Sequence, residues 1–84
     1  MPPTFTFEDL KRLLIERVGM EEDEIADDPS LEFEAMGLDS LAFEEIQIVL
    51  EDTYGFLISR EDAQEITTAE QAIEYTNRRI AEQA

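Results

Sequence analysis

The sequence contains no cysteine, no histidine and no tryptophan. Without cysteine, the chain can form no disulfide, no thiolate metal site and no thiol nucleophile of its own. Without histidine, it lacks the side chain that most often serves as general base and as metal ligand near neutral pH. If the protein takes part in covalent chemistry, we therefore expect the reactive group to be attached to the chain rather than supplied by its own side chains.

Basic residues are scarce: the 84 residues include 6 Lys and Arg against 22 Asp and Glu, a formal net charge of −16. Nucleic-acid binding needs clustered cations, and an anionic membrane repels a strongly acidic surface. We therefore expect the protein to bind neither nucleic acid nor membranes. No apolar run approaches the length of about 20 residues that a membrane-spanning helix needs. The start, Met-Pro-Pro-Thr, has no signal-peptide pattern. We therefore predict a cytoplasmic protein, and we expect it to be a monomer.

The length of the chain limits the size of its core. Most domains have about 100–150 residues, so a chain of 84 residues is predicted to be one domain, 1–84. A chain of this size buries about 60–65% of the surface that its unfolded form exposes. Such a core leaves little room for the water-excluding cleft that most enzymes need, so we expect a protein without catalytic activity of its own.

Apolar residues recur at helical spacing in three long segments, and glycine marks the ends of the first two. In the first segment, Thr6 is a candidate N-cap and Gly19 a candidate left-handed C-cap. Gly55 ends the second segment in the same way. No two apolar runs have the pattern of paired strands. We predict an all-α, small four-helix bundle with helices over residues 7–18, 40–54, 60–65 and 67–82, the third one short.

A long connection, residues 19–39, separates the first two predicted helices. It contains no Lys or Arg and is rich in Asp and Glu. Loops of this length are uncommon in compact domains, which indicates either a functional loop or an unrecognised element. Several apolar side chains along it could pin it onto the helices: Ile25, Leu31, Phe33, Met36 and Leu38.

The second predicted helix has two apolar faces when its residues are placed at intervals of about 100°. The broad face, which we expect to meet the core, carries Ala42, Phe43, Ile46, Val49, Leu50 and Thr53. Nearly opposite lies a narrow pair, Leu41 and Ile48, framed by Glu45 and Asp52 on one edge and by Glu44 and Glu51 on the other. This pair is either the ordinary apolar surface of a small protein or an apolar stripe that docks a basic partner.

Ser40 stands at the start of this helix, within the segment Gly37-Leu38-Asp39-Ser40-Leu41. One interpretation is an ordinary N-cap, in which Asp39 or Ser40 accepts a hydrogen bond from a free backbone amide. The other is that the Ser40 hydroxyl carries a phosphodiester. The free amides and the positive end of the helix dipole would then stabilise its negative charge. The residues of this segment alone leave both interpretations open.

The tripeptide Asp39-Ser40-Leu41 resembles the phosphopantetheine attachment motif of acyl carrier proteins. The similarity extends upstream through residues 33–38 (FEAMGL) and downstream through residues 65–68 (EITT) and the last helix. It covers nearly the whole chain, and it includes the length, the acidity, the helix pattern, the long first loop and the position of the serine. On these grounds the sequence is similar to an acyl carrier protein.

The resemblance implies that a phosphopantetheinyl transferase attaches 4'-phosphopantetheine from coenzyme A to Ser40, with Asp39 and Leu41 as its neighbours in the motif. The arm ends in a thiol, which carries an acyl chain as a thioester from enzyme to enzyme. The carrier itself catalyses nothing. The other partners implied are a ketosynthase with its chain-length factor, a malonyl transferase and tailoring enzymes.

In the family that the sequence resembles, partner enzymes contact the second helix. Leu41 and Ile48 match apolar contact positions of that family. Its acidic contact positions match Glu45, Glu51 and Asp52. Glu44 departs from this pattern, because fatty-acid carriers usually have an aliphatic residue at its position. The docking surface implied by the resemblance therefore comprises Leu41, Glu44, Glu45, Ile48, Glu51 and Asp52, with Glu44 as the departure.

Among acyl carriers, two features favour the discrete carriers of type II polyketide synthases, which are aromatic and iterative. Ala42 follows the motif where fatty-acid carriers generally have an acidic residue, and residues 5–14 (FTFEDLKRLL) are similar to polyketide carriers. Residues 66–69 (ITTA) and Tyr75 look more like fatty-acid carriers, and Ala35 departs from both groups. We predict a carrier of growing polyketide chains, with a fatty-acid synthase carrier as the alternative.

Proteins of other classes fit the sequence less well. An acidic interaction module would also explain the net charge of −16, and Ser40 would then be only a helix cap. The carboxylates of residues 21–34 lack the ligand spacing and the central glycine of an EF-hand loop, so we predict no metal site. A hydrolase needs paired carboxylates in a sheltered site, but those of the second helix are predicted to lie on a convex surface open to water.

The net charge yields a prediction about stability. Like charges repel one another in the compact state, and added salt screens that repulsion, with a Debye length of about 10 Å at 0.1 M. We expect the melting temperature, followed by circular dichroism, to rise from low to moderate ionic strength and to rise with added magnesium. A melting temperature that stays constant over this range would contradict the account.

Overall fold

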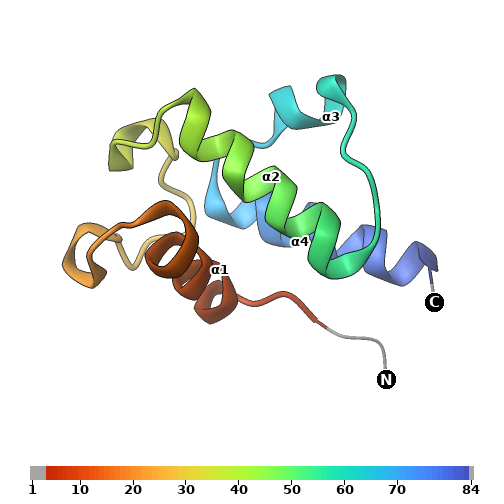
Figure 1. The fold of residues 1–84 in the computed structure, drawn as a ribbon, viewed down its shortest axis with the longest axis horizontal. Coiled ribbons are helices and arrows are strands. Elements are labelled where there is room, and N and C mark those ends of the chain that lie inside the picture. Colours follow the sequence, from red (N-terminus) through yellow and green to blue (C-terminus); the bar gives the residue numbers. More distant parts are fainter. Residues whose placement is uncertain (1–3, 84) are drawn as a thin grey trace.

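A computed structural model describes residues 4–83, which fold into α-helices joined by shorter helical turns (Figure 1). The α-helices are α1 (Phe7–Leu13), α2 (Ser40–Tyr54), α3 (Arg60–Glu65) and α4 (Ala69–Gln83). A π-helical turn, η1 (Leu14–Val18), continues α1, and two 3-10 turns, η2 (Glu22–Glu24) and η3 (Glu34–Met36), lie in the connection to α2. The predicted all-α fold with four helices is confirmed. The two short turns are unrecognised elements of the kind that the length of the connection indicated, although their positions were not predicted.

Strand pairing within residues 4–83 is limited to one isolated antiparallel bridge, between Glu32 and Thr68. In the same part of the chain, no helix combines the length and the apolar content that crossing a bilayer requires. Residues 1–3 and 84, which the predicted domain also includes, lie outside the described range.

Local signals in the sequence predict most of the helix ends correctly. The Thr6 hydroxyl accepts from the Asp9 N–H (3.2 Å) and the Asp9 carboxylate accepts from the Thr6 N–H (3.0 Å), which forms a capping box. Gly19 and Gly55 end the first two helical segments with φ angles of 89° and 78°. The last helix begins at Ala69, slightly later than its predicted start.

The final turn of the first helical segment differs from the α-helix predicted over residues 7–18. From Leu14 to Val18 the chain forms a π-helical turn, and the Met20 N–H donates to the Leu14 carbonyl at 3.0 Å. Hydrophobic periodicity indicates that a segment is helical, but it does not distinguish one π turn from one α turn. The segment therefore has the predicted length and a different hydrogen-bond pattern at its end.

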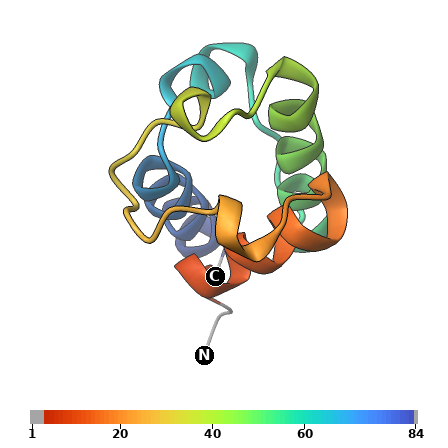
Figure 2. The ribbon, with the colours of Figure 1, turned by 90° about the vertical axis from the view of Figure 1, so that its left-hand side faces the viewer.

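The hydrophobic core lies where the helices face one another, and the view along the bundle shows them arranged around it (Figure 2). The first helical segment, α2 and α4 each supply large side chains that are at most 2% exposed: Leu10, Leu14, Ile46, Leu50 and Thr76. The Thr76 hydroxyl oxygen has no hydrogen-bond partner among the described residues. The rest of this set is aliphatic, so burial of apolar surface is the main force that holds the helices together.

Helix α2 is divided into a buried and an exposed face, as its sequence predicts. Ile46 and Leu50 are 1% and 2% exposed, whereas Leu41 and Ile48 are 74% and 47% exposed. Phe43 and Val49 of the broad face are half-buried against the core, and Ala42 is half-buried as well. The predicted orientation of α2 is therefore confirmed over most of its length.

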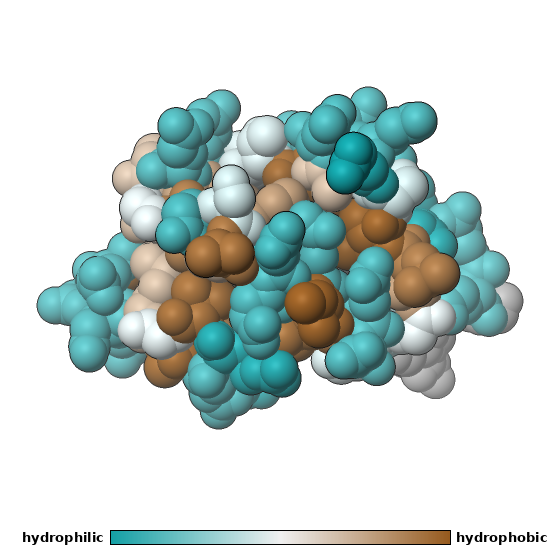
Figure 3. Space-filling model, turned by 45° about the horizontal axis from the view of Figure 1, so that its top comes forward, coloured by the Kyte–Doolittle hydropathy of each residue, from teal (hydrophilic) through white to brown (hydrophobic). Residues whose placement is uncertain are grey.

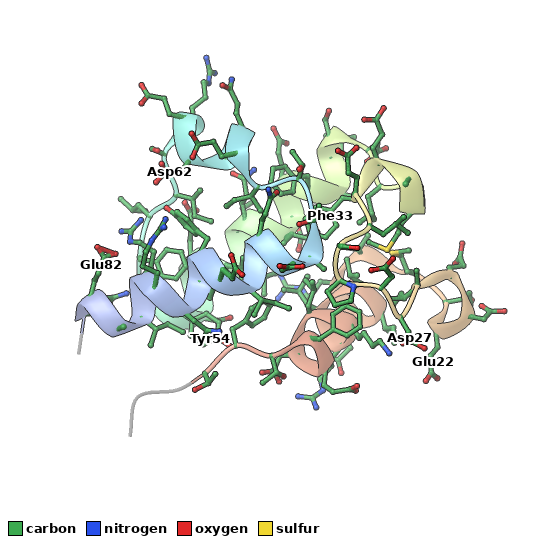
Figure 4. The ribbon with its side chains drawn as sticks, turned by 180° about the vertical axis from the view of Figure 1, so that it is seen from behind. Glu22, Asp27, Phe33, Tyr54, Asp62 and Glu82 are labelled. Atoms are coloured by element: carbon green, nitrogen blue, oxygen red, sulfur yellow. The ribbon has the colours of Figure 1, made fainter. Side chains whose placement is uncertain are left out.

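The prediction is wrong at the C-terminal end of α2, where Thr53 is exposed instead of facing the core. The next residue, Tyr54, is half-buried against this end of the core, and its ring forms a T-shaped contact with the Phe5 ring, with centroids 5.8 Å apart. Figure 4 shows Tyr54 below α4, beside the segment that leads into α1. The larger aromatic side chain buries more apolar surface than a threonine can, so it takes the inward position.

The long connection before α2 is anchored along its length. Ile25 and Phe33 are 6% and 5% exposed, in agreement with the expectation that apolar side chains pin it to the helices. Its backbone is bonded to the start of α4, because the Phe33 N–H donates to the Thr67 carbonyl and the Glu70 N–H donates to the Pro29 carbonyl, both at 2.8 Å. The connection is therefore a fixed part of the fold that leads directly to Ser40.

Helix α3 is fastened to α4 by a short chain of hydrogen bonds. The Tyr75 hydroxyl donates to Asp62 Oδ2 at 2.8 Å and accepts from Arg79 Nη1 at 2.7 Å. Arg79 Nη1 also donates to the Leu57 carbonyl, in the connection before α3, at 2.9 Å. Burial raises the pKa of the Tyr75 phenol above its usual value, and the bond to Asp62 raises it further. This chain holds a six-residue helix that is too short to be stable alone.

The two faces of α2 predict different mutational costs. Ile46→Ala removes a side chain that is 1% exposed, and we expect it to lower the free energy of unfolding by about 2–5 kcal/mol. Ile48→Ala lies on the exposed face, and we expect a loss of about 1 kcal/mol or less. Urea unfolding of both variants measures these losses, and equal losses would mean that the two faces are assigned wrongly.

Candidate functional site at the start of helix α2

A tight turn directs the chain from the core to the first residue of α2. Gly37 follows η3 with a φ angle of 85°, a conformation that a residue with a Cβ rarely adopts. Its N–H donates to the Glu34 carbonyl at 3.0 Å, and the Leu38 N–H donates to the Phe33 carbonyl at 3.1 Å. These are the paired bonds of a Schellman motif. The turn brings the start of α2 next to the buried Phe33 side chain.

The N-cap of α2 is Asp39. Its Oδ1 atom accepts from the Ala42 N–H at 2.9 Å, and its backbone is extended as an N-cap requires. Ser40 is the first residue of the helix and is exposed. Of the two capping residues that the sequence left open, the structure selects Asp39. The Ser40 hydroxyl is therefore free of the capping role and accessible to solvent.

The position of Ser40 suits an attached anion. The first backbone N–H groups of an α-helix have no intrahelical acceptor, and the helix dipole places partial positive charge at this end. Asp39 already satisfies one of these N–H groups. A phosphodiester on the Ser40 hydroxyl would lie at the same end of a helix of 15 residues, where its negative charge is favourable. An exposed hydroxyl at this place fits the prosthetic group that the sequence motif implies.

A groove of about 900 Å³ opens beside Ser40, between α2, α3 and residues 32–39. Its apolar lining includes Phe33, Phe43 and Ile66, and the rings of Phe33 and Phe43 lie 5.9 Å apart between centroids. Phe33 is 5% exposed, and Figure 4 shows it between the connection that precedes α2 and the helices. Its polar lining includes Glu44, Gln47, Arg60, Gln64 and Thr67.

The sequence alone does not indicate this groove. Its lining residues come from separate segments of the chain, and they meet only when the connection before α2 and helix α3 are in place. Arg60 is a cation of this lining whose place at the site the sequence does not indicate. No pattern of neighbouring residues could have placed Arg60 beside the groove, because its position depends on how α3 packs.

The outer face of α2 carries the predicted apolar pair and its acidic frame. Leu41 and Ile48 are exposed, as are Glu44 and Asp52. Seen from this side of the molecule, apolar side chains lie among hydrophilic ones (Figure 3). The residues predicted as an apolar stripe with flanking carboxylates therefore lie together on one accessible surface.

Two of the flanking carboxylates have partners within the chain. Glu45 Oε1 accepts from Arg17 Nη2 of η1 at 3.1 Å, and the Glu45 side chain is 35% exposed. Glu51 Oε2 accepts from the Ile58 N–H, in the connection before α3, at 2.7 Å. The sequence places four carboxylates around the apolar pair, and the structure separates them into two that are exposed and two that are bonded to other segments. The partners were not predictable, because they are distant along the chain.

Some carboxylates of the acidic connection, residues 19–39, stabilise its conformation. Asp28 Oδ1 accepts from the Ser30 N–H (3.0 Å) and hydroxyl (2.6 Å), and these bonds lower the pKa of Asp28 below its usual value. Lys11 forms an ion pair with Asp27, which holds the connection against α1. Figure 4 shows Glu22 and Asp27 on the outer side of this connection. Across residues 4–83, no group of three or more carboxylates has an arrangement that could hold a metal ion.

Comparison with known proteins identifies the family. Residues 8–76 match the family model described as "Phosphopantetheine attachment site". Among solved structures, the chain is similar to octanoyl acyl carrier protein from the actinorhodin polyketide synthase of Streptomyces coelicolor, determined by NMR in solution. The two chains are 34% identical, the match covers 100% of each, and the TM-score is 0.87. The resemblance noted from the sequence and its cofactor, 4'-phosphopantetheine, are thus confirmed. The chain belongs to the acyl carrier proteins.

Proposed function

We propose that the protein carries a growing polyketide chain as a thioester on a 4'-phosphopantetheine arm attached to Ser40. The observation that carries this proposal is the exposed Ser40 hydroxyl at the start of α2, with the capping role taken by Asp39. The similar carrier from the actinorhodin polyketide synthase supports the choice of polyketide synthesis over fatty-acid synthesis. The arm supplies the thiol that a chain without cysteine cannot supply.

The residues around Ser40 have defined tasks in this proposal. Ser40 Oγ forms the phosphodiester bond to the arm, and the N-terminal end of α2 stabilises its negative charge. Asp39 holds the first turn of α2, to which Ser40 belongs, in place through the Ala42 N–H. Leu41 is 74% exposed beside the attachment point, where it presents an apolar surface to a docking enzyme.

The groove beside Ser40 offers a place for the acyl chain between reactions. Phe33, Phe43 and Ile66 provide apolar contacts for methylene groups, and burial of each such group is favourable by about 0.8 kcal/mol. Polar lining residues such as Gln47 and Arg60 offer hydrogen-bond donors to carbonyl oxygens. The groove is open, so a sheltered chain can leave it when an enzyme binds.

The outer face of α2 is the proposed docking surface for the enzymes that use the carrier. Its residues are Leu41, Glu44, Glu45, Ile48, Glu51 and Asp52. The proposed partners are a phosphopantetheinyl transferase, a ketosynthase with its chain-length factor, a malonyl transferase and tailoring enzymes. Exposed ion pairs contribute about 0–1 kcal/mol each, so docking is weak and fast, as a carrier that must leave each enzyme requires.

The carrier is proposed to be a single domain over residues 1–84 that does no catalysis of its own. The carboxylates of α2 lie on its outer face or bond to other segments of the chain, and the open groove does not isolate them from water. A general acid or base at a carboxylate needs a raised pKa from such isolation. The chemistry therefore belongs to the enzymes that bind the carrier.

Attachment at Ser40 is tested by the intact mass of the apo-protein before and after incubation with coenzyme A, magnesium and a broadly tolerant phosphopantetheinyl transferase. We expect the wild-type protein to gain one phosphopantetheinyl group. Ser40→Ala should gain nothing, because it lacks the hydroxyl oxygen that forms the phosphodiester.

Ser59→Ala is the matched control. Ser59 also stands at a helix start, where its hydroxyl accepts from the Asp62 N–H at 3.1 Å, and its removal should leave the gain in mass unchanged. A gain in Ser40→Ala, or no gain in folded wild-type apo-protein, would contradict the proposal. In the second case, an acidic interaction module in which Ser40 only begins a helix becomes the better account.

A further inference from the structure

Arg17 lies beside the outer face of α2. It belongs to η1, which packs against α2, and its Nη2 atom donates to Glu45 Oε1 at 3.1 Å. The side chains of Arg17 and Glu45 are 54% and 35% exposed, so the ion pair lies at the surface. A cation from the first helical segment thus reaches one of the four carboxylates that frame Leu41 and Ile48.

The other cations of the first helical segment have different partners. Arg12 pairs with Asp9 of the same segment at 3.8 Å, and Lys11 pairs with Asp27 of the following connection. Neither contact involves α2. Among the three cations of α1 and η1, Arg17 is therefore the one that alters the charge of the docking surface.

The Arg17–Glu45 pair changes what an approaching enzyme meets. Glu45 alone presents a negative charge, but Glu45 with Arg17 at 3.1 Å presents a dipole without net charge. A partner cation placed against Glu45 also comes close to the Arg17 guanidinium, and like charges at this distance repel each other, most strongly at low ionic strength. Glu44 and Asp52 are exposed elsewhere on the helix and still attract a cation. The docking surface is thus acidic at Glu44 and Asp52 and mixed in charge at Arg17 and Glu45.

We propose that Arg17 is a specificity-determining residue of the docking surface. The surface then fits an enzyme with a mixed patch, which has cations opposite Glu44 and Asp52 and a carboxylate opposite Arg17. This inference rests on the proposed function, in which partner enzymes dock on α2. An enzyme whose patch is basic throughout has to displace Arg17 from Glu45 or accept a contact between like charges. Arg17 therefore discriminates against such enzymes, as a repulsive element in a specific interface does.

The test uses a phosphopantetheinyl transferase whose docking patch is basic throughout, with apo-carrier as the varied substrate. Arg17→Ala should lower the KM for the carrier about two- to fivefold relative to Arg12→Ala, because an exposed ion pair shifts an equilibrium by up to about fivefold. Both variants lose one positive charge, so the net charge is the same in both. The kcat should be the same in both variants, since Arg17 acts on docking and not on the transfer step. The difference in KM should disappear at high salt, where the Debye length falls to about 3 Å.

A second substitution separates the loss of the Arg17 charge from the loss of side-chain volume. Arg17→Gln, which keeps a polar side chain of similar length, should behave as Arg17→Ala does, and circular dichroism checks that each variant is folded.

The outcomes distinguish this inference from the function on which it rests. If wild-type apo-protein takes up no phosphopantetheine, the proposed function fails and the inference fails with it. If the wild type is modified at Ser40 but Arg17→Ala and Arg12→Ala have the same KM, the inference alone is overturned. The same holds if Arg17→Gln has the same KM as Arg12→Ala.

Discussion

The arrangement of this protein depends on the burial of one face of helix α2. Ile46 and Leu50 are almost completely buried, and this fixes how the helix is turned about its own axis. Because the side chains of a helix follow a period of 3.6 residues, that rotation places Leu41 and Ile48 in solvent on the other side. The same rotation leaves Ser40 exposed at the helix start. Attachment point and docking surface are therefore consequences of core packing.

Other parts of the fold hold the surroundings of α2 in place. The connection before it is bonded through Phe33 to Thr67, which brings the chain to Ser40 from a fixed anchor. Helix α3 is held through Asp62 and Tyr75, and it forms one side of the groove beside the serine. An acyl carrier has to present an arm and receive several enzymes in turn. A rigid frame around an exposed helix meets that need, because each enzyme finds the same surface.

The sequence predicts the features that depend on neighbouring residues. Thr6, Gly19 and Gly55 act at their own helix ends, and the two faces of α2 follow from spacing within one helix. The motif around Ser40 also lies in one short segment. The contacts between distant segments were not predictable, and these include the groove, the chain from Asp62 to Arg79 and the ion pair of Arg17 with Glu45. Thr53 was misplaced for the same reason, since Tyr54 and Phe5 compete with it for the core.

The most direct test of this account is to map the surface that a partner enzyme contacts. Isotope-labelled apo-protein is titrated with a phosphopantetheinyl transferase without coenzyme A, and the amide chemical shifts are followed by NMR. We expect the perturbed amides to cluster at Ser40 and Leu41 and along the outer face of α2 through Ile48, with fast exchange between free and bound protein. Perturbations centred on α4 or on the 19–32 part of the connection, with α2 unaffected, would contradict it.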